Sequence, residues 1–307
     1  MAILVNPMSG EPAVWRAELA RALPGETIYL WPEVGPAADI EFAFVAKMPV
    51  ERLGDFPNLK LVGSLVAGVD HLLAARDLPK VPFVRTAAPG GDAMITEFAL
   101  LHVLRHHRQL PQYQALQAQR VWQALPQKRA EERTVGLMGL GTLGAPTATA
   151  LAGLGFQVAG WSRRPKAIDG VGSFAEADLH PFLARSEILV NLLPLTPSTQ
   201  RILNRETLLQ LPAGASIVNL GRGGHVDTAA LLELLDSGHL SHATLDVFDE
   251  EPLPKDSPLW AHPKVTITPH VARRQRPADL VAQIARTLDE FRAGRDLSQR
   301  IDFQHGY

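Results

Sequence analysis

Short apolar runs alternate with helix-like segments through most of the chain. From residue 134 onward the runs are rich in Val, Ile and Leu with little polar alternation, which is typical of strands buried on both faces of a sheet. The segment 228–236 between two of them has helical spacing, with Asp227 or Thr228 as a cap and Gly238 as a stop. The predicted strands are 134–138, 157–161, 188–192, 216–220, 243–247 and 265–268. This alternation predicts a doubly wound parallel sheet.

The N-terminal part repeats this pattern on a smaller scale. Its predicted strands are 2–6, 27–31, 40–46, 59–65 and 82–86. Predicted helices span 15–23, 92–107 and 112–122, and a last helix spans 278–293. We therefore expect an α/β protein with a first domain of residues 1–97, a second of residues 98–273, and a C-terminal helix from about residue 274.

Composition narrows the class of protein. A length of 307 residues suits about two domains, and 46% apolar residues can form sizeable cores. Thirty Lys and Arg against 32 Asp and Glu offer no general attraction to nucleic acid or an anionic membrane. Without cysteine there is no disulfide, thiolate metal site or Cys nucleophile. With no signal-like or membrane-spanning apolar stretch, we expect a soluble, cytoplasmic protein.

A glycine-rich loop follows the predicted strand 134–138 and opens a helical segment. In Gly139-Leu140-Gly141-Thr142-Leu143-Gly144 the first glycine allows a tight turn, the second lets the backbone approach a pyrophosphate, and the third permits close helix packing. A helix N-terminus also presents free N–H groups to phosphates. The flanking elements favour a dinucleotide-binding loop over a tight turn that binds nothing.

The end of the next predicted strand bears on which dinucleotide binds. An NAD-selective site usually places Asp or Glu about 20 residues beyond the loop, where it binds the ribose 2′-OH. Here Ser162-Arg163-Arg164 stands at that place, and the first acid is Asp169. A guanidinium suits a 2′-phosphate, so the run favours NADP(H), with NAD(H) possible. The alternative is a pair of solvated loop arginines.

Polar groups follow the last three predicted strands. Arg222, an acid of the run Asp249-Glu250-Glu251, and His270 should converge, because the carboxyl ends of parallel strands border the ligand crevice. The imidazole can protonate a carbonyl oxygen as a hydride arrives, and a carboxylate can orient it and stabilise its charged form. The guanidinium can clamp a substrate carboxylate through two hydrogen bonds.

These groups lie in recognisable motifs. The motifs are Val218-Asn219-Leu220-Gly221-Arg222-Gly223, Asp246-Val247-Phe248 through Glu251-Pro252-Leu253-Pro254, and Thr268-Pro269-His270-Val271-Ala272. Together with the glycine loop they resemble the D-isomer specific 2-hydroxyacid dehydrogenase family, most closely its glyoxylate/hydroxypyruvate reductase A branch. The resemblance extends over nearly the whole chain.

The resemblance implies an activity and a set of site residues. A reductase of this kind transfers a hydride from NADPH to small 2-oxo acids such as glyoxylate and hydroxypyruvate, giving (R)-2-hydroxy acids. Arg222 would bind and polarise the 2-oxo acid, and His270, paired with Glu251, would be the acid/base. The implied cofactor contacts beyond the phosphate residues are Thr142, Leu143, Leu193, Pro194, Leu220 and Asp246, the last near the nicotinamide.

The resemblance also implies an architecture. Residues 1–97 and 274–307 would form a flavodoxin-like substrate domain, with the C-terminal helix packed back on the first domain, and residues 98–273 a Rossmann NAD(P)-binding domain. The active site would lie in the cleft between them. The implied partners are a small 2-oxo or 2-hydroxy acid and a second copy of the chain in a homodimer.

Three departures from the family pattern concern the substrate pocket. In Leu65-Val66-Ala67-Gly68-Val69-Asp70, which resembles the loop whose N–H groups hold the substrate carboxylate, Val66 replaces a glycine. Ala46 stands near a position that is often aromatic. Arg273 and Arg274 follow the His270 motif; they either are solvated at the start of a helix or favour substrates with a second anionic group.

Other functions fit the sequence less well. His102 and His106 are one helical turn apart, but no third ligand joins them at a metal-binding spacing, so we expect no metal. A hydrolase would need a Gly-x-Ser-x-Gly elbow, which is absent. The alternative of another class is a nucleotide-sensing binding protein with little turnover, against which the intact Arg222, Glu251 and His270 argue.

Overall fold

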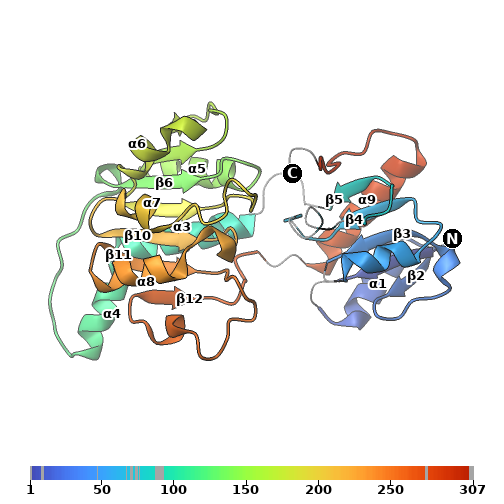
Figure 1. Ribbon diagram of the computed structural model, residues 1–307, viewed down its shortest axis with the longest axis horizontal. Coiled ribbons are helices and arrows are strands. Elements are labelled where there is room, and N and C mark those ends of the chain that lie inside the picture. Colours follow the sequence, from blue (N-terminus) through green and yellow to red (C-terminus); the bar gives the residue numbers. More distant parts are fainter. Residues whose placement is uncertain are drawn as a thin grey trace. The chain divides into compact units, whose positions relative to one another are not determined.

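The chain divides into two compact units, Met1–Pro89 with Gln275–Tyr307, and Gly90–Arg274 (Figure 1). The structure, a computed structural model, describes residues 2–7, 10–46, 48–66, 68–69, 72, 75, 77–86, 93–273 and 276–303. The predicted boundary at residues 97–98 falls inside helix α3 (Ala93–His107), which lies in the second unit. No helix in these described stretches is long and apolar enough to cross a bilayer.

The first unit is a five-stranded parallel sheet in the order β2-β1-β3-β4-β5. Ile3 and Val5 pack with Leu280 and Ile284 of the C-terminal helix, while Leu4 joins a second apolar cluster. Successive residues of a strand point to opposite faces, so covering both faces explains the unbroken apolar run of β1. The elements are β1 (Ala2–Asn6), α1 (Pro12–Ala22), β2 (Thr27–Leu30), β3 (Ile40–Val45), β4 (Leu61–Ser64), β5 (Phe83–Arg85) and α9 (Pro277–Arg292).

The second unit is a seven-stranded parallel sheet in the order β12-β11-β10-β9-β6-β7-β8. The chain runs outward from β6 in one direction and restarts at β9 in the other, so β6 and β9 flank the switch point where such sheets bind ligands. Its strands are β6 (Thr134–Met138), β7 (Gln157–Trp161), β8 (Val171–Phe174), β9 (Ile188–Asn191), β10 (Ala215–Asn219), β11 (Leu240–Leu245) and β12 (Val265–Ile267). The two sheets confirm the predicted fold class.

Helices precede and connect the strands of this unit, and α3 contacts β9, β10 and α5. Besides α3 they are α4 (Leu110–Ala118), α5 (Gly144–Gly153), α6 (Leu179–Leu183), α7 (Arg205–Leu209) and α8 (Thr228–Asp236). The carboxylate of Asp227 accepts hydrogen bonds from the N–H groups of Ala229 and Ala230, so Asp227 caps α8. Helix α4 begins before its predicted start. Pro111 fits its first turn, because the backbone N–H groups of a first turn make no hydrogen bond within the helix and proline lacks that N–H.

Strand β8 was not predicted. It pairs with β7 at the edge of the sheet, and its central Gly172 and Ser173 are exposed. An edge strand needs fewer apolar side chains, so it lacks the Val- and Ile-rich run that marks the buried strands.

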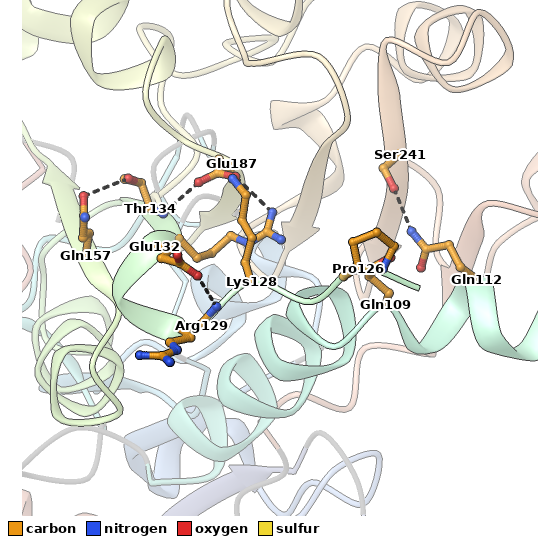
Figure 2. Close-up of polar contacts among 11 residues, drawn as sticks. Gln109, Gln112, Pro126, Lys128, Arg129, Glu132, Thr134, Gln157, Glu187 and Ser241 are labelled. Atoms are coloured by element: carbon orange, nitrogen blue, oxygen red, sulfur yellow. Dashed lines mark hydrogen bonds and ion pairs between the residues drawn. The ribbon is translucent and has the colours of Figure 1, made fainter. Parts of the chain in front are cut away.

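The segment after α4 returns along the outside of the second unit toward β6 (Figure 1). Figure 2 shows how polar side chains attach its end to the sheet. The carboxylate of Glu187 lies 2.6 Å from Lys128 Nζ and 3.1 Å from Arg133 Nη1, and it accepts the N–H of Thr134 at 3.2 Å. Trp122, near the start of the segment, is fully exposed.

Candidate active site

The glycine loop between β6 and α5 leaves no room for side chains at two of its positions. Gly139 has φ +95°, and a Cβ there would lie 3.0 Å from the carbonyl oxygen of Leu192. A Cβ on Gly144 would lie 1.8 Å from the carbonyl oxygen of Gly139. A Cβ on Gly141 would meet no atom within 4 Å, and this residue is exposed. The loop therefore presents open backbone at the start of α5, as a bound pyrophosphate requires.

The segment after β7 supplies cations beside this loop. Ser162 is buried and donates its hydroxyl to the carbonyl of Arg164 at 2.7 Å, while Arg163 and Arg164 are exposed. Lys166, which the sequence analysis did not single out, donates Nζ to the carbonyl of Leu140 at 2.7 Å. The third cation in Ser-Arg-Arg-Pro-Lys was the available signal.

Glu251 and His270 are in contact. One carboxylate oxygen of Glu251 lies 2.7 Å from His270 Nδ1, and the other accepts the backbone N–H of Phe248 at 3.0 Å. Both side chains are about one-third exposed, at 35% and 37%. Because a carboxylate only accepts hydrogen bonds, Nδ1 carries the proton, and Nε2 is the nitrogen available to a substrate.

The turn that carries His270 depends on Asp246. His270 has φ +52°, a conformation that costs a non-glycine residue about 1 kcal/mol. The buried carboxylate of Asp246 accepts the hydroxyl of Thr268 at 2.6 Å and the N–H groups of Val271 and Ala272 at 2.9 Å each. The backbone of Asp246 also accepts the N–H of His270 at 2.8 Å. These hydrogen bonds hold the histidine at the end of β12.

Arg222 follows β10, the strand next to β11. Its Nη1 donates to the carbonyl of Gly221 at 2.8 Å, and its own carbonyl accepts from Asn219 Nδ2 at 3.0 Å. A Cβ on Gly223 would lie 1.9 Å from the carbonyl carbon of Phe248, so the loop after β10 packs directly on the loop that carries Glu251. Arg222, Glu251 and His270 thus follow three adjacent strands, as predicted from their order.

Other predicted site residues lie at further loops. Leu193 and Pro194 follow β9, where Leu193 is buried and Pro194 exposed, and Leu220 is buried after β10. Thr142 is exposed in the glycine loop, and Leu143 directly precedes α5.

The predicted substrate loop belongs to the first unit. Ser64 Oγ donates to the carbonyl of Val66 at 3.0 Å and accepts its N–H at 3.4 Å, and Gly68 is partly exposed. Ala67 and Arg274 lie outside the described residues. Their predicted roles, and those of Val66 and Gly68, stay predictions.

The histidines of α3 pack inside the second unit. Thr244 Oγ1 lies 3.0 Å from His106 Nε2 and 3.4 Å from His102 Nδ1. Burial lowers the pKa of His102 to about 4 and that of His106 to about 3. Within the described residues, no group of three or more His, Asp or Glu side chains is placed to hold a metal ion.

Known proteins resemble this chain along its whole length. A sequence model of the D-isomer specific 2-hydroxyacid dehydrogenase family, NAD binding domain, matches residues 100–272. A glyoxylate/hydroxypyruvate reductase A from Salmonella paratyphi B is 41% identical over 302 residues, which cover 96% of each chain.

Solved structures of proteins from this family also resemble the chain. A D-isomer specific 2-hydroxyacid dehydrogenase from Xanthobacter autotrophicus Py2, in complex with NADPH and MES, superposes with a TM-score of 0.94 at 42% identity, over 100% of this chain and 99% of its own. An NADPH-dependent glyoxylate/hydroxypyruvate reductase from Sinorhizobium meliloti, in complex with NADP and sulfate, superposes with a TM-score of 0.93 at 37% identity over 100% of both chains. The motifs had predicted this family, and the chain belongs to it: the protein is an oxidoreductase of the D-isomer specific 2-hydroxyacid dehydrogenase family.

Proposed function

We propose that the protein is an NADPH-preferring reductase of small 2-oxo acids, with glyoxylate and hydroxypyruvate as substrates and (R)-2-hydroxy acids as products. The observation that carries this proposal is the 2.7 Å contact between Glu251, which follows β11, and His270, which follows β12. Arg222 follows β10, the other neighbour of β11. The relatives named glyoxylate/hydroxypyruvate reductase and the relative bound to NADPH support it.

The glycine loop and the cations after β7 would hold the cofactor. Gly139, Gly141 and Gly144 would receive the pyrophosphate at the start of α5, and the Ser162-Arg163-Arg164 run would bind the 2′-phosphate. Lys166 is tied to this loop by its bond to the Leu140 carbonyl and would add positive charge there. Bound NADPH would supply the hydride for carbonyl reduction.

The three residues at the ends of β10, β11 and β12 would act on the substrate. Arg222 would hold the carboxylate and carbonyl oxygen of the 2-oxo acid through its two-pronged guanidinium. His270 would give a proton from Nε2 to the carbonyl oxygen as the hydride arrives at the carbon. Glu251 would keep Nδ1 protonated and stabilise the imidazolium before that transfer.

The substrate loop of the first unit enters the proposal through the family resemblance. Backbone N–H groups of Val66, Ala67 and Gly68 would bind the substrate carboxylate. Arg273, two residues after Val271, is partly buried. If it borders the site, it would favour substrates with a second anionic group. Comparing oxaloacetate with glyoxylate in an Arg273→Ala variant tests this: equal losses for both acids would assign Arg273 no part in selection.

An assay of NADPH and NADH consumption with glyoxylate and hydroxypyruvate tests the proposed function. One arginine–phosphate hydrogen bond, worth about 1.5–3 kcal/mol, gives a preference for NADPH of roughly tenfold to a hundredfold. Replacing both Arg163 and Arg164 by Ala should raise the KM for NADPH strongly and that for NADH little. Arg295→Ala, at an exposed arginine of the first unit, is the control.

Two results would contradict the proposal. Equal use of NADH and NADPH at low salt would remove the NADPH preference. Tight NADPH binding without turnover of any 2-oxo acid would favour the alternative, a nucleotide-sensing binding protein.

We further propose that the chain forms a homodimer in the cytoplasm. Apolar side chains are exposed on α3, α4 and the segment after them, namely Leu101, Leu104, Leu110, Val121 and Trp122. Exposed apolar surface of this kind marks association sites. Light scattering should give a dimer for the wild-type protein and a monomer for a Leu101→Glu, Trp122→Glu variant; a monomeric wild type would contradict the proposal.

A further inference from the structure

A fourth histidine lies directly beneath the Arg222 loop. His225 ends the short 3₁₀ turn Gly223–His225, and its side chain is fully buried. Its Nδ1 lies 3.0 Å from the backbone N–H of Arg222 and 2.9 Å from Asn191 Nδ2, and its Nε2 lies 3.2 Å from the carbonyl oxygen of Pro194. The imidazole therefore touches both the loop after β9 and the loop after β10.

These contacts determine the protonation state of the ring. A backbone N–H can only donate, so Nδ1 of His225 must accept and carries no proton. A carbonyl oxygen can only accept a hydrogen bond, so Nε2 must carry the proton that is shared with the carbonyl oxygen of Pro194. The side chain is thus a neutral imidazole with the Nε2–H tautomer. A second proton on Nδ1 would remove the acceptor for Arg222.

Two buried asparagines complete the connection. Asn191 Nδ2 also donates to Asn219 Oδ1 at 2.9 Å, and Asn191 Oδ1 accepts the N–H of Leu193 at 3.1 Å. Asn219 Nδ2 donates to the carbonyl of Arg222 at 3.0 Å. Side chains at the ends of β9 and β10 thereby fix the backbone of both loops, and His225 adds a contact with each loop.

The Arg222 loop passes very close over this imidazole. A Cβ on Gly221 would lie 2.9 Å from His225 Nδ1 and 3.0 Å from Asn191 Nδ2. A fully buried polar ring held at this distance has little freedom. The N–H of Arg222 depends directly on Nδ1, and the carbonyl of Pro194 depends directly on Nε2–H.

We propose that His225 is a positioning residue that orients Arg222 through one ring nitrogen and the loop of Leu193 and Pro194 through the other. Nδ1 holds the backbone of Arg222, and Nε2–H holds the loop that contains Leu193 and Pro194. This inference rests on the roles proposed above for Arg222, Leu193 and Pro194.

Two substitutions separate the two nitrogens. His225→Asn places an amide oxygen near the position of Nδ1, so it keeps an acceptor for Arg222 and loses the donor to Pro194. His225→Gln places an amide nitrogen near the position of Nε2, so it keeps the donor to Pro194 and loses the acceptor for Arg222 and Asn191. Asn191 keeps its hydrogen bonds with Asn219 Oδ1 and the N–H of Leu193. Thermal unfolding of both variants checks that they are folded, and His180→Gln, at an exposed residue, is the control.

The measurements are the Kd for NADPH by fluorescence, the Kd for oxalate with NADP⁺ bound, and kcat/KM for glyoxylate. His225→Gln should weaken oxalate binding and lower kcat/KM by about three- to tenfold, the size of one hydrogen bond, with little change in the NADPH Kd. His225→Asn should weaken NADPH binding by a similar factor of about three to ten and leave oxalate binding near that of the wild type.

Nitrogen-15 NMR of the imidazole tests the inference without turnover. The wild-type His225 ring should show the neutral Nε2–H form at pH 7. Equal effects of both variants on NADPH and oxalate, unchanged binding in both, or a ring with Nδ1 protonated would each overturn the inference. Absence of glyoxylate turnover in the wild type, with the tautomer and the NADPH arm as expected, would instead contradict the proposed function.

Discussion

Histidines of the second unit lie in two opposite surroundings. His270 lies at the end of β12, about one-third exposed, with a carboxylate oxygen of Glu251 at 2.7 Å. His102 and His106 lie on α3, 5% and 6% exposed, and their ring nitrogens meet the hydroxyl of Thr244. His270 has an acid and solvent beside it, whereas His102 and His106 have a hydroxyl and an apolar core.

The surroundings of the buried group keep it neutral. Burial is the main cause that lowers the pKa of His102 to about 4 and that of His106 to about 3. His242 on β11, half-buried with its ring 6.2 Å from that of His106, joins this group, and burial lowers its pKa to about 4. The charge of Arg105 acts in the same direction on all three. A buried imidazole without a carboxylate partner loses hydration when it is charged, and nothing replaces that hydration. The comparison teaches that a histidine suits proton transfer only where water or an acid supports its charged form.

Removing the histidine at the strand end should have the largest effect. We expect His270→Ala to lower kcat for glyoxylate by roughly 10²–10⁴, the usual size of general acid catalysis, with NADPH affinity largely intact. Steady-state kinetics and NADPH fluorescence measure the two quantities, with His180→Ala as the control. A comparable loss of kcat in His102→Gln would break the distinction between the two groups.

The next largest effect should be a loss of stability at low pH, caused by the buried histidines. Their lowered pKa values mean that the unfolded chain binds more protons than the folded chain between about pH 6.5 and pH 3–4, so the free energy of unfolding should fall as the pH drops through this range. Each histidine that stays neutral contributes up to about 1.4 kcal/mol per pH unit. Urea unfolding at a series of pH values measures the slope.

A variant sharpens that measurement. His106→Leu should make the slope shallower, because one buried proton-binding group is gone while Thr244 keeps its contact with His102. His180→Gln, at an exposed residue of α6, should leave the slope as in the wild type. A His106→Leu slope equal to that of the wild type would show that burial of this ring does not govern acid stability.

Removing only the acid partner should have the smallest effect. Glu251→Gln keeps the size of the side chain and removes the charge that stabilises the imidazolium of His270, so the pH optimum of reduction should move to lower pH. The loss of kcat near pH 7 should be smaller than the roughly 10² minimum expected for His270→Ala. Full pH profiles of kcat/KM check this. An unmoved optimum would remove the pairing from the mechanism.

Much of the fold was predictable because buried parallel strands leave a local pattern. The predicted bounds 134–138 and 157–161 coincide with β6 and β7, which are covered on both faces and so are buried and apolar after their first residue. Strand β8 escaped prediction because an edge strand carries no such run. The predicted boundary near residue 97 falls within α3, because this helix is amphipathic like any covering helix and nothing in its pattern shows which sheet it covers.

The candidate site divides in the same way. Gly139, Arg222 and His270 stand in local motifs whose chemistry is legible residue by residue, since each follows a strand whose end must face the ligand crevice. The hydrogen bonds of His225, and those that Asp246 accepts from the turn of His270, cannot be predicted from a local motif in this way. Asn191 and His225 are separated by 34 positions and Asp246 and Ala272 by 26, and these pairs meet only because β9, β10, β11 and β12 are neighbours in one sheet. Motifs specify which groups are present, whereas hydrogen bonds of about 3 Å between distant segments depend on strand order and register, which no local pattern encodes.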